Sequence, residues 1–309
     1  MEFLIDKVEM SDLKEIKNLA INNDGNQKLS ELYLQHNYFN NPFKSKSFWK
    51  VKVNDKIEGF ATSNNFKYII DNKICMVAMP QNVLTSIKLR GKGLFNKLYN
   101  HTEIDNLESN KVDYFLTFTN ELSTPIFLNK FGYLKGKCPN LLISFFNPSK
   151  FFAHKNYQIV KDLNSINFEN IFRYNNSMFK SKDFFIWRYK LYDKNVFTVI
   201  SIYKNKLVAG YAFFITEKKK GIKFLILSDI ITYKEENISF IIDTCRVFIT
   251  KKFFPMFIMF ELQSKTTKNI FTHTLKDRFN FLIKGKSTQE NNLLCNKKFN
   301  LFFSDTDFI

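Results

Sequence analysis

The spacing of apolar residues changes several times along the first 150 residues. Apolar residues that recur every three or four positions are typical of an amphipathic helix, and alternating or short continuous apolar runs are typical of a strand. Helical spacing occurs at residues 11–20, 32–39, 94–107 and 123–131. Strand-like runs occur at residues 2–8, 48–53, 57–61, 68–70, 73–79, 82–87, 112–119 and 141–146. Because hairpins come first and one crossover follows, the pattern predicts a mixed, mostly antiparallel sheet flanked by helices, in the α/β (α+β) class.

A basic turn with two glycines joins one predicted strand to the helix that follows it. Gly91 and Gly93 let the backbone approach a ligand closely, and unpaired amides at a helix N-terminus attract anions. Arg90 and Lys92 place positive charge beside these glycines. The segment therefore predicts a binding site for a molecule that carries phosphate, and the alternative is a turn that only ends a strand and starts a helix.

The second half of the chain repeats part of the first. Tyr38 and Tyr189 are 151 positions apart, and Gly59 and Gly210 are separated by the same 151 positions with no gap between the two pairs. Both glycines follow a polar turn between two strand-like runs. The shared offset predicts a duplication, and a chance match of so few identities is the alternative.

The predicted duplication divides the chain into two domains, residues 1–150 and residues 151–309. At the same offset, Ile242 and Thr244 stand where the first half has its two turn glycines. The second domain is therefore expected to lack the phosphate site.

Composition leaves several classes of partner open and excludes others. A net charge of +17 suits nucleic acid, an anionic membrane or an anionic ligand, but the lysines are scattered, which disfavours a nucleic-acid partner. The four cysteines lie far apart and form no metal-binding spacing, so no metal is expected; they are Cys75, Cys138, Cys245 and Cys295.

Membrane and export signals are also missing from the pattern. The short acidic start is unlike a signal peptide, and no apolar run reaches the ~20 residues that span a bilayer. The Phe-rich residues 253–257 are expected to form a buried strand with its flanks and not a membrane anchor. We therefore expect a cytoplasmic protein with free thiols.

The glycine turn resembles a motif of the GCN5-related N-acetyltransferase (GNAT) superfamily. That family has Gln/Arg-x-x-Gly-x-Gly/Ala after a strand, and here Lys88 to Gly93 match it, with Lys88 where Gln or Arg is usual. Phe131-Gly132-Tyr133 is similar to the family's Leu-Gly-Phe after its last helix. The resemblance implies two tandem GNAT-like domains, of which only the first binds coenzyme A.

A closer resemblance is to tandem GNAT proteins linked to bacterial surface-polysaccharide synthesis. They carry a Trp-Lys/Arg-Tyr motif, which the second half matches with Trp187-Arg188-Tyr189, while the first half keeps His36-Asn37-Tyr38. They also carry an Asn and a Ser after the fifth main strand, matched by Asn120 and Ser123.

The resemblance implies transfer of an acyl group from acetyl-CoA to an amine. A backbone amide at Leu84 or Thr85 would stabilise the charge on the carbonyl oxygen. The family's usual acid is a Tyr, but Leu128 stands at that position, so Ser123 or Tyr114 is the alternative donor. Glu121 is the candidate base, with a solvated turn carboxylate as the other interpretation. The residues expected to contact the cofactor are Leu84, Thr85, Ser86, Lys88, Leu89, Arg90, Gly91, Lys92, Gly93, Leu94, Phe95 and Asn120.

These features together predict an acyl-CoA-dependent N-acyltransferase. The family analogy implies a small-molecule amine acceptor, with an amino sugar on a nucleotide or lipid carrier as the first choice. A Fem-type aminoacyl transferase is one alternative, and a non-catalytic module that binds coenzyme A or nucleic acid is another. The sequence leaves the oligomeric state open.

Overall fold

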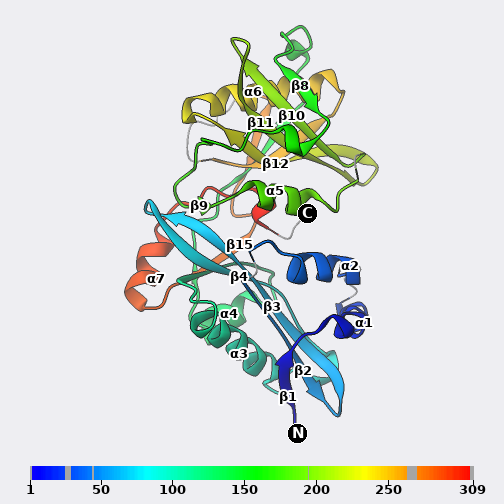
Figure 1. Cartoon of the computed structure of the whole chain (residues 1–309), viewed down its shortest axis with the longest axis vertical. Coiled ribbons are helices and arrows are strands. Elements are labelled where there is room, and N and C mark those ends of the chain that lie inside the picture. Colours follow the sequence, from blue (N-terminus) through cyan, green and yellow to red (C-terminus); the bar gives the residue numbers. More distant parts are fainter. Residues whose placement is uncertain (1, 25–28, 44, 194, 263–269, 307–309) are drawn as a thin grey trace. The chain divides into compact units, whose positions relative to one another are not determined.

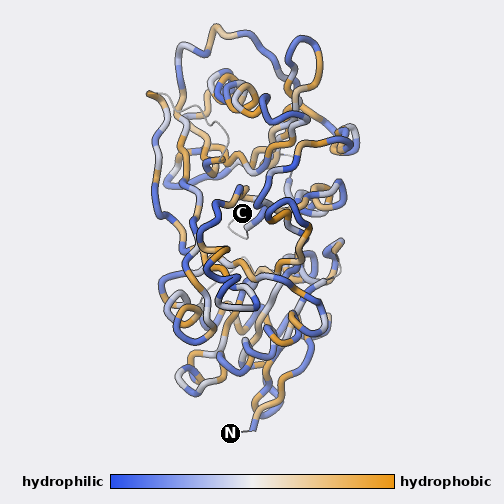
Figure 2. The backbone as a smooth tube through the Cα atoms, turned by 90° about the vertical axis from the view of Figure 1, so that its left-hand side faces the viewer, coloured by the Kyte–Doolittle hydropathy of each residue, from blue (hydrophilic) through white to orange (hydrophobic). Residues whose placement is uncertain are grey.

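The computed structural model describes residues 2–24, 29–43, 45–193, 195–262 and 270–306 (Figure 1). The chain forms two compact units, Met1–Lys137 with Phe279–Lys297, and Cys138–Arg278 with Lys298–Ile309. In each unit hydrophobic residues are concentrated on the strands and on the helix faces that cover them (Figure 2).

The first unit is a mixed sheet with helices on both faces. Its strand order is β1-β2-β3-β4-β5-β15-β6, and the neighbours in this order pair antiparallel except for the parallel pair β4–β5. Phe60 packs with α1 and α2, whereas Ala61, next to it on β3, packs with α3 on the opposite face.

The strands are β1 (Leu4–Lys7), β2 (Lys46–Val53), β3 (Lys56–Ile70), β4 (Lys73–Thr85), β5 (Tyr114–Thr119), β6 (Leu134–Lys135) and β15 (Asn280–Lys284). The helices are α1 (Leu13–Asp24), α2 (Glu31–Leu34), α3 (Leu94–Glu108), α4 (Thr124–Lys130) and α7 (Thr288–Cys295).

The second unit repeats this strand order. Its sheet runs β8-β10-β11-β12-β13-β7-β14, again antiparallel except for the parallel pair β12–β13. The predicted fold class, mixed and mostly antiparallel sheets flanked by helices, is confirmed. The strands are β7 (Leu141–Phe145), β8 (Tyr157–Val160), β10 (Phe197–Lys204), β11 (Leu207–Lys219), β12 (Ile222–Thr232), β13 (Met256–Phe260) and β14 (Thr272–Leu275). The main helices are α5 (Lys182–Tyr189) and α6 (Ile238–Lys251).

Each sheet includes a strand from the other half of the chain. β7, expected as the last strand of a domain that ends at residue 150, pairs with β13 and β14 in the second unit. β15 takes the corresponding place beside β5 in the first unit. The units therefore divide at residue 137 and exchange a strand, whereas the sequence divides them at residue 150. An apolar run predicts a strand but does not say which sheet satisfies its backbone hydrogen bonds.

The hairpin strands are longer than the apolar pattern predicts. β3 continues through the polar stretch of Thr62 to Asn65, whose side chains are all buried. They satisfy one another and their neighbours: Asn65 Nδ2 donates to Asn106 Oδ1 at 2.8 Å, and Asn41 Nδ2 donates to Asn64 Oδ1 at 3.1 Å. Because these partners come from distant elements, the local sequence looks like a loop while the structure is a strand.

A tyrosine holds a β-bulge in each unit. In β4, Asn82 and Val83 lie between the paired residues Gln81 and Leu84, against a single residue of β3. The Tyr38 hydroxyl accepts hydrogen bonds from Asn82 Nδ2 at 2.9 Å and from Thr62 Oγ1 at 2.9 Å.

The second unit has the same arrangement. Ser228 is the extra residue of the bulge in β12, and its Oγ lies 2.8 Å from the Tyr189 hydroxyl. The shared tyrosines of the repeat therefore have the same structural role: Tyr38 contacts the bulge in β4, and Tyr189 contacts the bulge in β12.

The shared glycines allow close contact between backbones. A Cβ atom at Gly210 would lie 2.2 Å from the Ile231 carbonyl oxygen and 2.7 Å from Ile241 Cδ1, and one at Gly59 would lie 2.9 Å from the Leu84 carbonyl oxygen. We expect Gly210→Ala to lower the free energy of unfolding by about 3 kcal/mol, because backbone must move to admit the methyl group. Urea unfolding followed by circular dichroism measures this loss.

Gly221→Asn is the matched control. Gly221 has φ +83° and open space around its Cβ position, and asparagine tolerates this conformation. We expect a change below about 1 kcal/mol. An equal loss in both variants would contradict the close-contact explanation.

The C-terminal segment, residues 299–306, is buried in the second unit. Phe303 stacks on Phe260 of β13 with ring centroids 4.7 Å apart, and η7 (Phe303–Asp305) packs against β12. Lys180 Nζ lies 2.9 Å from Asp229 Oδ2 and 2.6 Å from Asp305 Oδ1. The segment thus fills the space at the place where β12 and β13 separate.

This buried cluster makes stability depend on pH. Burial, opposed by Lys180, raises the pKa of Asp229 to about 6, so the cost of ionising this carboxyl grows as the pH rises from about 4 to about 6. We expect Lys180→Met to lower the free energy of unfolding by about 4 kcal/mol at pH 7 and by less at pH 5, where Asp229 takes up a proton. Urea unfolding at both pH values measures the difference.

Lys150→Met is the control, because it breaks a half-exposed pair with Asp243 at 2.8 Å and should cost below about 1 kcal/mol at either pH. A Lys180→Met loss that does not change with pH would contradict the assignment.

Candidate functional site

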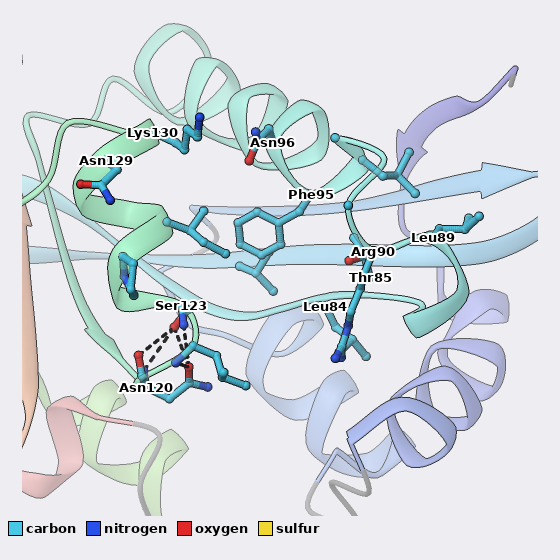
Figure 3. A pocket seen from close by; sticks show the side chains of 17 residues that line it. Leu84, Thr85, Leu89, Arg90, Phe95, Asn96, Asn120, Ser123, Asn129 and Lys130 are labelled. Atoms are coloured by element: carbon cyan, nitrogen blue, oxygen red, sulfur yellow. Dashed lines mark hydrogen bonds between the residues drawn. The ribbon is translucent and has the colours of Figure 1, made fainter.

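A cavity opens in the first unit where β4 and β5 separate. The two strands pair only at Val77 with Tyr114 and at Ala78 with Phe115, so their pairing ends before the bulge in β4. The cavity has a volume of about 710 Å³. It is lined by Val83, Leu84, Thr85, Leu89, Arg90, Gly91, Gly93, Leu94, Phe95, Asn96, Asn120, Leu122, Ser123, Pro125, Ile126, Asn129 and Lys130 (Figure 3).

The end of β4 directs one backbone amide toward this cavity. The Ser86 amide donates to the Glu58 carbonyl oxygen at 2.7 Å, which makes these residues a hydrogen-bonded pair of the antiparallel ladder. Hydrogen bonding alternates along such a ladder, so the neighbouring Thr85 amide points away from β3 and toward the side where the sheet opens. Of the two predicted amide donors, Leu84 faces β3 and Thr85 faces the opening.

The glycine turn forms one wall of the cavity. Gly91 and Gly93 have φ values of +79° and +77°, and neither has an atom within 4 Å of its Cβ position. Side chains at these positions would be strained and would project into the open space. The turn therefore leaves its backbone uncovered.

The helix that follows the turn adds hydrogen-bond donors. α3 begins at Leu94 with Gly93 as its N-cap, and no side chain caps it. The first intrahelical bond runs from Lys97 to the Gly93 carbonyl, so the amides of residues 94–96 have no acceptor within the helix. Figure 3 shows the Arg90 side chain extending beside Thr85 toward Leu84, which adds positive charge at this wall.

The opposite wall is the turn that starts α4. Asn120 Oδ1 accepts from the Ser123 amide at 2.8 Å and from Ser123 Oγ at 3.0 Å, as drawn in Figure 3. The Leu122 amide also donates to Asn120 Oδ1, at 3.0 Å. Asn120 thus fixes the turn, and Ser123 presents a hydroxyl at the edge of the cavity.

The predicted cofactor residues divide into two groups. Nine of the twelve line the cavity, while Ser86, Lys88 and Lys92 do not. Ser86 is buried in its backbone hydrogen bond, and the two lysines are exposed outside the cavity. The three predicted catalytic residues also separate: Ser123 lines the cavity, but Glu121 and Tyr114 do not.

Tyr114 lies at the start of β5, whereas the cavity lies beyond its far end. Burial, assisted by the charges of Cys75 and Glu290, raises the pKa of Tyr114 above its usual value, so its hydroxyl keeps its proton. Leu128 points into an apolar cluster with Phe115 and Phe127 and does not line the cavity.

Sequence reasoning missed the contribution of α4. Leu122, Ile126 and Asn129 follow at helical spacing and line the cavity together with Pro125 and Lys130. That spacing is visible in the sequence, but only the fold shows that this face of α4 lies opposite the glycine turn.

Among the residues that the structure describes, no group of three His, Cys, Asp or Glu side chains could hold a metal ion. No helix in the described ranges is long and apolar enough to span a membrane.

Several solved structures share this fold. A protein of Enterococcus faecalis V583, described as a probable N-acyltransferase, is 13% identical with a TM-score of 0.66, and the match covers 92% of this chain and 72% of that one. A GCN5-related N-acetyltransferase from Anabaena variabilis ATCC 29413 is 11% identical with a TM-score of 0.64, covering 91% and 72%. Saccharomyces cerevisiae N-myristoyltransferase with bound myristoyl-CoA is 10% identical with a TM-score of 0.57, covering 92% and 79%.

No protein-family model and no curated protein matches the sequence. The structural likeness confirms the predicted GNAT-like fold. At these identities it concerns the fold alone.

The uncovered amides of the glycine turn and Arg90 make the cavity a candidate binding site for anions. We expect inorganic pyrophosphate to bind, and Arg90→Gln to lower its affinity about tenfold because a charged hydrogen-bond donor is lost. Isothermal titration calorimetry at low salt measures the change. Lys88→Gln, which removes one equal charge outside the cavity, should change the affinity less than about twofold. Equal losses in the two variants would contradict a local role for Arg90.

Proposed function

We propose that the protein is an acyl-CoA-dependent N-acyltransferase with acetyl-CoA as its donor. The observation that carries the proposal is the glycine turn at the wall of the cavity, with two positive φ values and uncovered helix amides. A solved structure of the same fold, the yeast N-myristoyltransferase, holds an acyl-CoA. The residues of this chain fit such a ligand.

Three groups would hold the donor. The backbone of Gly91 and Gly93 and the first amides of α3 fit a pyrophosphate, and Arg90 adds its charge. Acyl-CoA supplies an activated acyl group as a thioester. The Thr85 amide faces the opening between β4 and β5, where it can donate to a carbonyl oxygen that gains negative charge.

Ser123 is the predicted proton donor that the cavity geometry favours. Its Oγ lines the cavity and donates to Asn120 Oδ1, so the hydroxyl is held in place at the mouth of the site. Glu121 is exposed in the same turn and stays the proposed base. Tyr114 is the weaker alternative because it lies at the other end of β5.

The acceptor that we propose is a small amine, with an amino sugar of a surface-polysaccharide precursor as the first choice. This choice rests on the resemblance of Trp187-Arg188-Tyr189 to tandem GNAT proteins of bacteria. The matching strand orders of the two sheets support a tandem origin. The second unit has no glycine turn at the start of α6, and the C-terminal segment fills its strand opening, so we propose one donor site per chain.

Gly91→Asp tests the donor site. The side chain would project into the space for the pyrophosphate and repel it, so we expect the affinity for acetyl-CoA to fall about 100-fold or more. Calorimetry with acetyl-CoA measures binding, and a thiol-release assay over a panel of amines measures transfer.

Gly221→Asp is the matched control, since Gly221 also has a positive φ and open surroundings but lies in the second unit. It should leave acetyl-CoA binding unchanged. Unchanged affinity in Gly91→Asp would show that the glycine turn does not bind acetyl-CoA.

A non-catalytic module that binds coenzyme A is the second candidate. Leu128, partly buried against an apolar cluster where the family has a Tyr, favours it. Binding of acetyl-CoA without thiol release on any amine would select this candidate. A Fem-type aminoacyl transferase would not need the pyrophosphate site, so absence of acetyl-CoA binding would favour that class instead.

A further inference from the structure

Three phenylalanine side chains from two segments meet at the surface of the second unit. Phe152 and Phe253 are 91% and 72% exposed, and Phe151 is 43% exposed. The ring centroids of Phe151 lie 5.7 Å from those of Phe152 and 5.9 Å from those of Phe253. We call Phe151, Phe152 and Phe253 the phenylalanine patch. Such a group of large exposed rings is unusual on a protein surface that contacts only water.

The backbone at Phe253 is strained in a way that keeps its ring exposed. Phe253 has φ +56°, in the left-handed region where a bulky residue is an outlier and glycine is the usual residue at a helix C-terminus. The Phe254 amide closes the end of α6 by donating to the Ile249 carbonyl at 2.9 Å, and Phe254 packs against the core. The sequence treats the Phe-rich segment as buried; the structure buries Phe257 and exposes Phe253.

Hydrogen bonds join the two segments that carry the patch. The Asn147 amide lies 3.5 Å from Thr250 Oγ1, which donates to the Asn147 carbonyl at 3.3 Å. The Phe146 amide donates to the Pro255 carbonyl at 2.7 Å. These bonds join the segment before β8 to the end of α6, so the three rings are held together before any partner arrives.

The two segments that carry the patch contain lysines and no acidic residue. Residues 148–156 contain Lys150 and Lys155, residues 249–257 contain Lys251 and Lys252, and neither segment contains an acidic residue. Lys150 pairs with Asp243 at 2.8 Å.

We propose that the phenylalanine patch and these lysines form a docking surface for an anionic phospholipid bilayer. Exposed aromatic rings partition into the interface of a membrane, and lysines around them are attracted by anionic headgroups. The two surface segments that carry the phenylalanine patch would make this contact without a helix that spans the membrane. A protein that acts on an acceptor carried by a lipid would gain from it, but the docking surface does not depend on the proposed chemistry.

Vesicle sedimentation tests the proposal with the full chain. Wild type should bind vesicles of phosphatidylcholine with phosphatidylglycerol and bind pure phosphatidylcholine vesicles far more weakly. Phe152→Ser with Phe253→Asn should lower the partition coefficient roughly 100-fold, about tenfold for each ring. Lys251→Gln with Lys252→Gln should lower it roughly 20-fold on anionic vesicles only.

Leu207→Ser is the control, because Leu207 is 75% exposed in the same unit and lies outside the patch. It should leave vesicle binding unchanged. Phe253→Asn relieves a strained backbone, so the double variant should keep its unfolding temperature and its affinity for acetyl-CoA.

Three results would overturn the proposal. They are absence of wild-type binding to anionic vesicles, equal binding by the double phenylalanine variant, and a concentration-dependent dimer in solution that this variant converts to a monomer. The last result would assign the patch to a contact between two copies of the chain.

Discussion

The bulge in β4 is the feature on which the candidate site depends. One extra residue bends the strand, and the Tyr38 hydroxyl fixes the bend through Asn82 and Thr62. β4 pairs with β5 only before the bend, at Val77 and Ala78, and beyond the bend the backbone amide of Thr85 faces away from β3. The cavity, the glycine turn and the first turn of α3 are all placed by this separation.

The second unit has the same bulge but lacks the glycine turn. Tyr189 holds the bulge in β12, and the strand order is the same. Here the C-terminal segment enters the space beside β12, where Lys180 joins Asp229 and Asp305 in a buried cluster. The opening that we propose holds a cofactor in the first unit is thus filled by protein in the second, where one lysine contacts both buried carboxylates.

The surface of the second unit carries an exposed phenylalanine, Phe253, in a strained backbone conformation. An exposed phenylalanine held at a positive φ costs free energy in the folded protein, and a glycine could close the end of α6 at a lower cost. Placed among lysines and near two other exposed rings, Phe253 suits an interface that is both apolar and anionic. The proposed donor site in one unit and the proposed membrane-facing surface in the other would each use a part of the net charge of +17.

The sequence by itself determined the helices and most strands of the first 150 residues and the glycine turn, because these depend on local spacing and on residues such as Gly91 and Gly93 whose backbone freedom is intrinsic. It did not show that β7 and β15 change places, or that Thr62 to Asn65 continue a strand, because both depend on hydrogen-bond partners far away in the chain. Nine of the predicted cofactor residues line the cavity, but the predicted Lys88 and Lys92 are exposed outside it. A charged residue next to a turn does not by itself show which way its side chain points. Only the tertiary structure decided which side chains converge, because the bulge and the packing of α4 set the shape of the space between them.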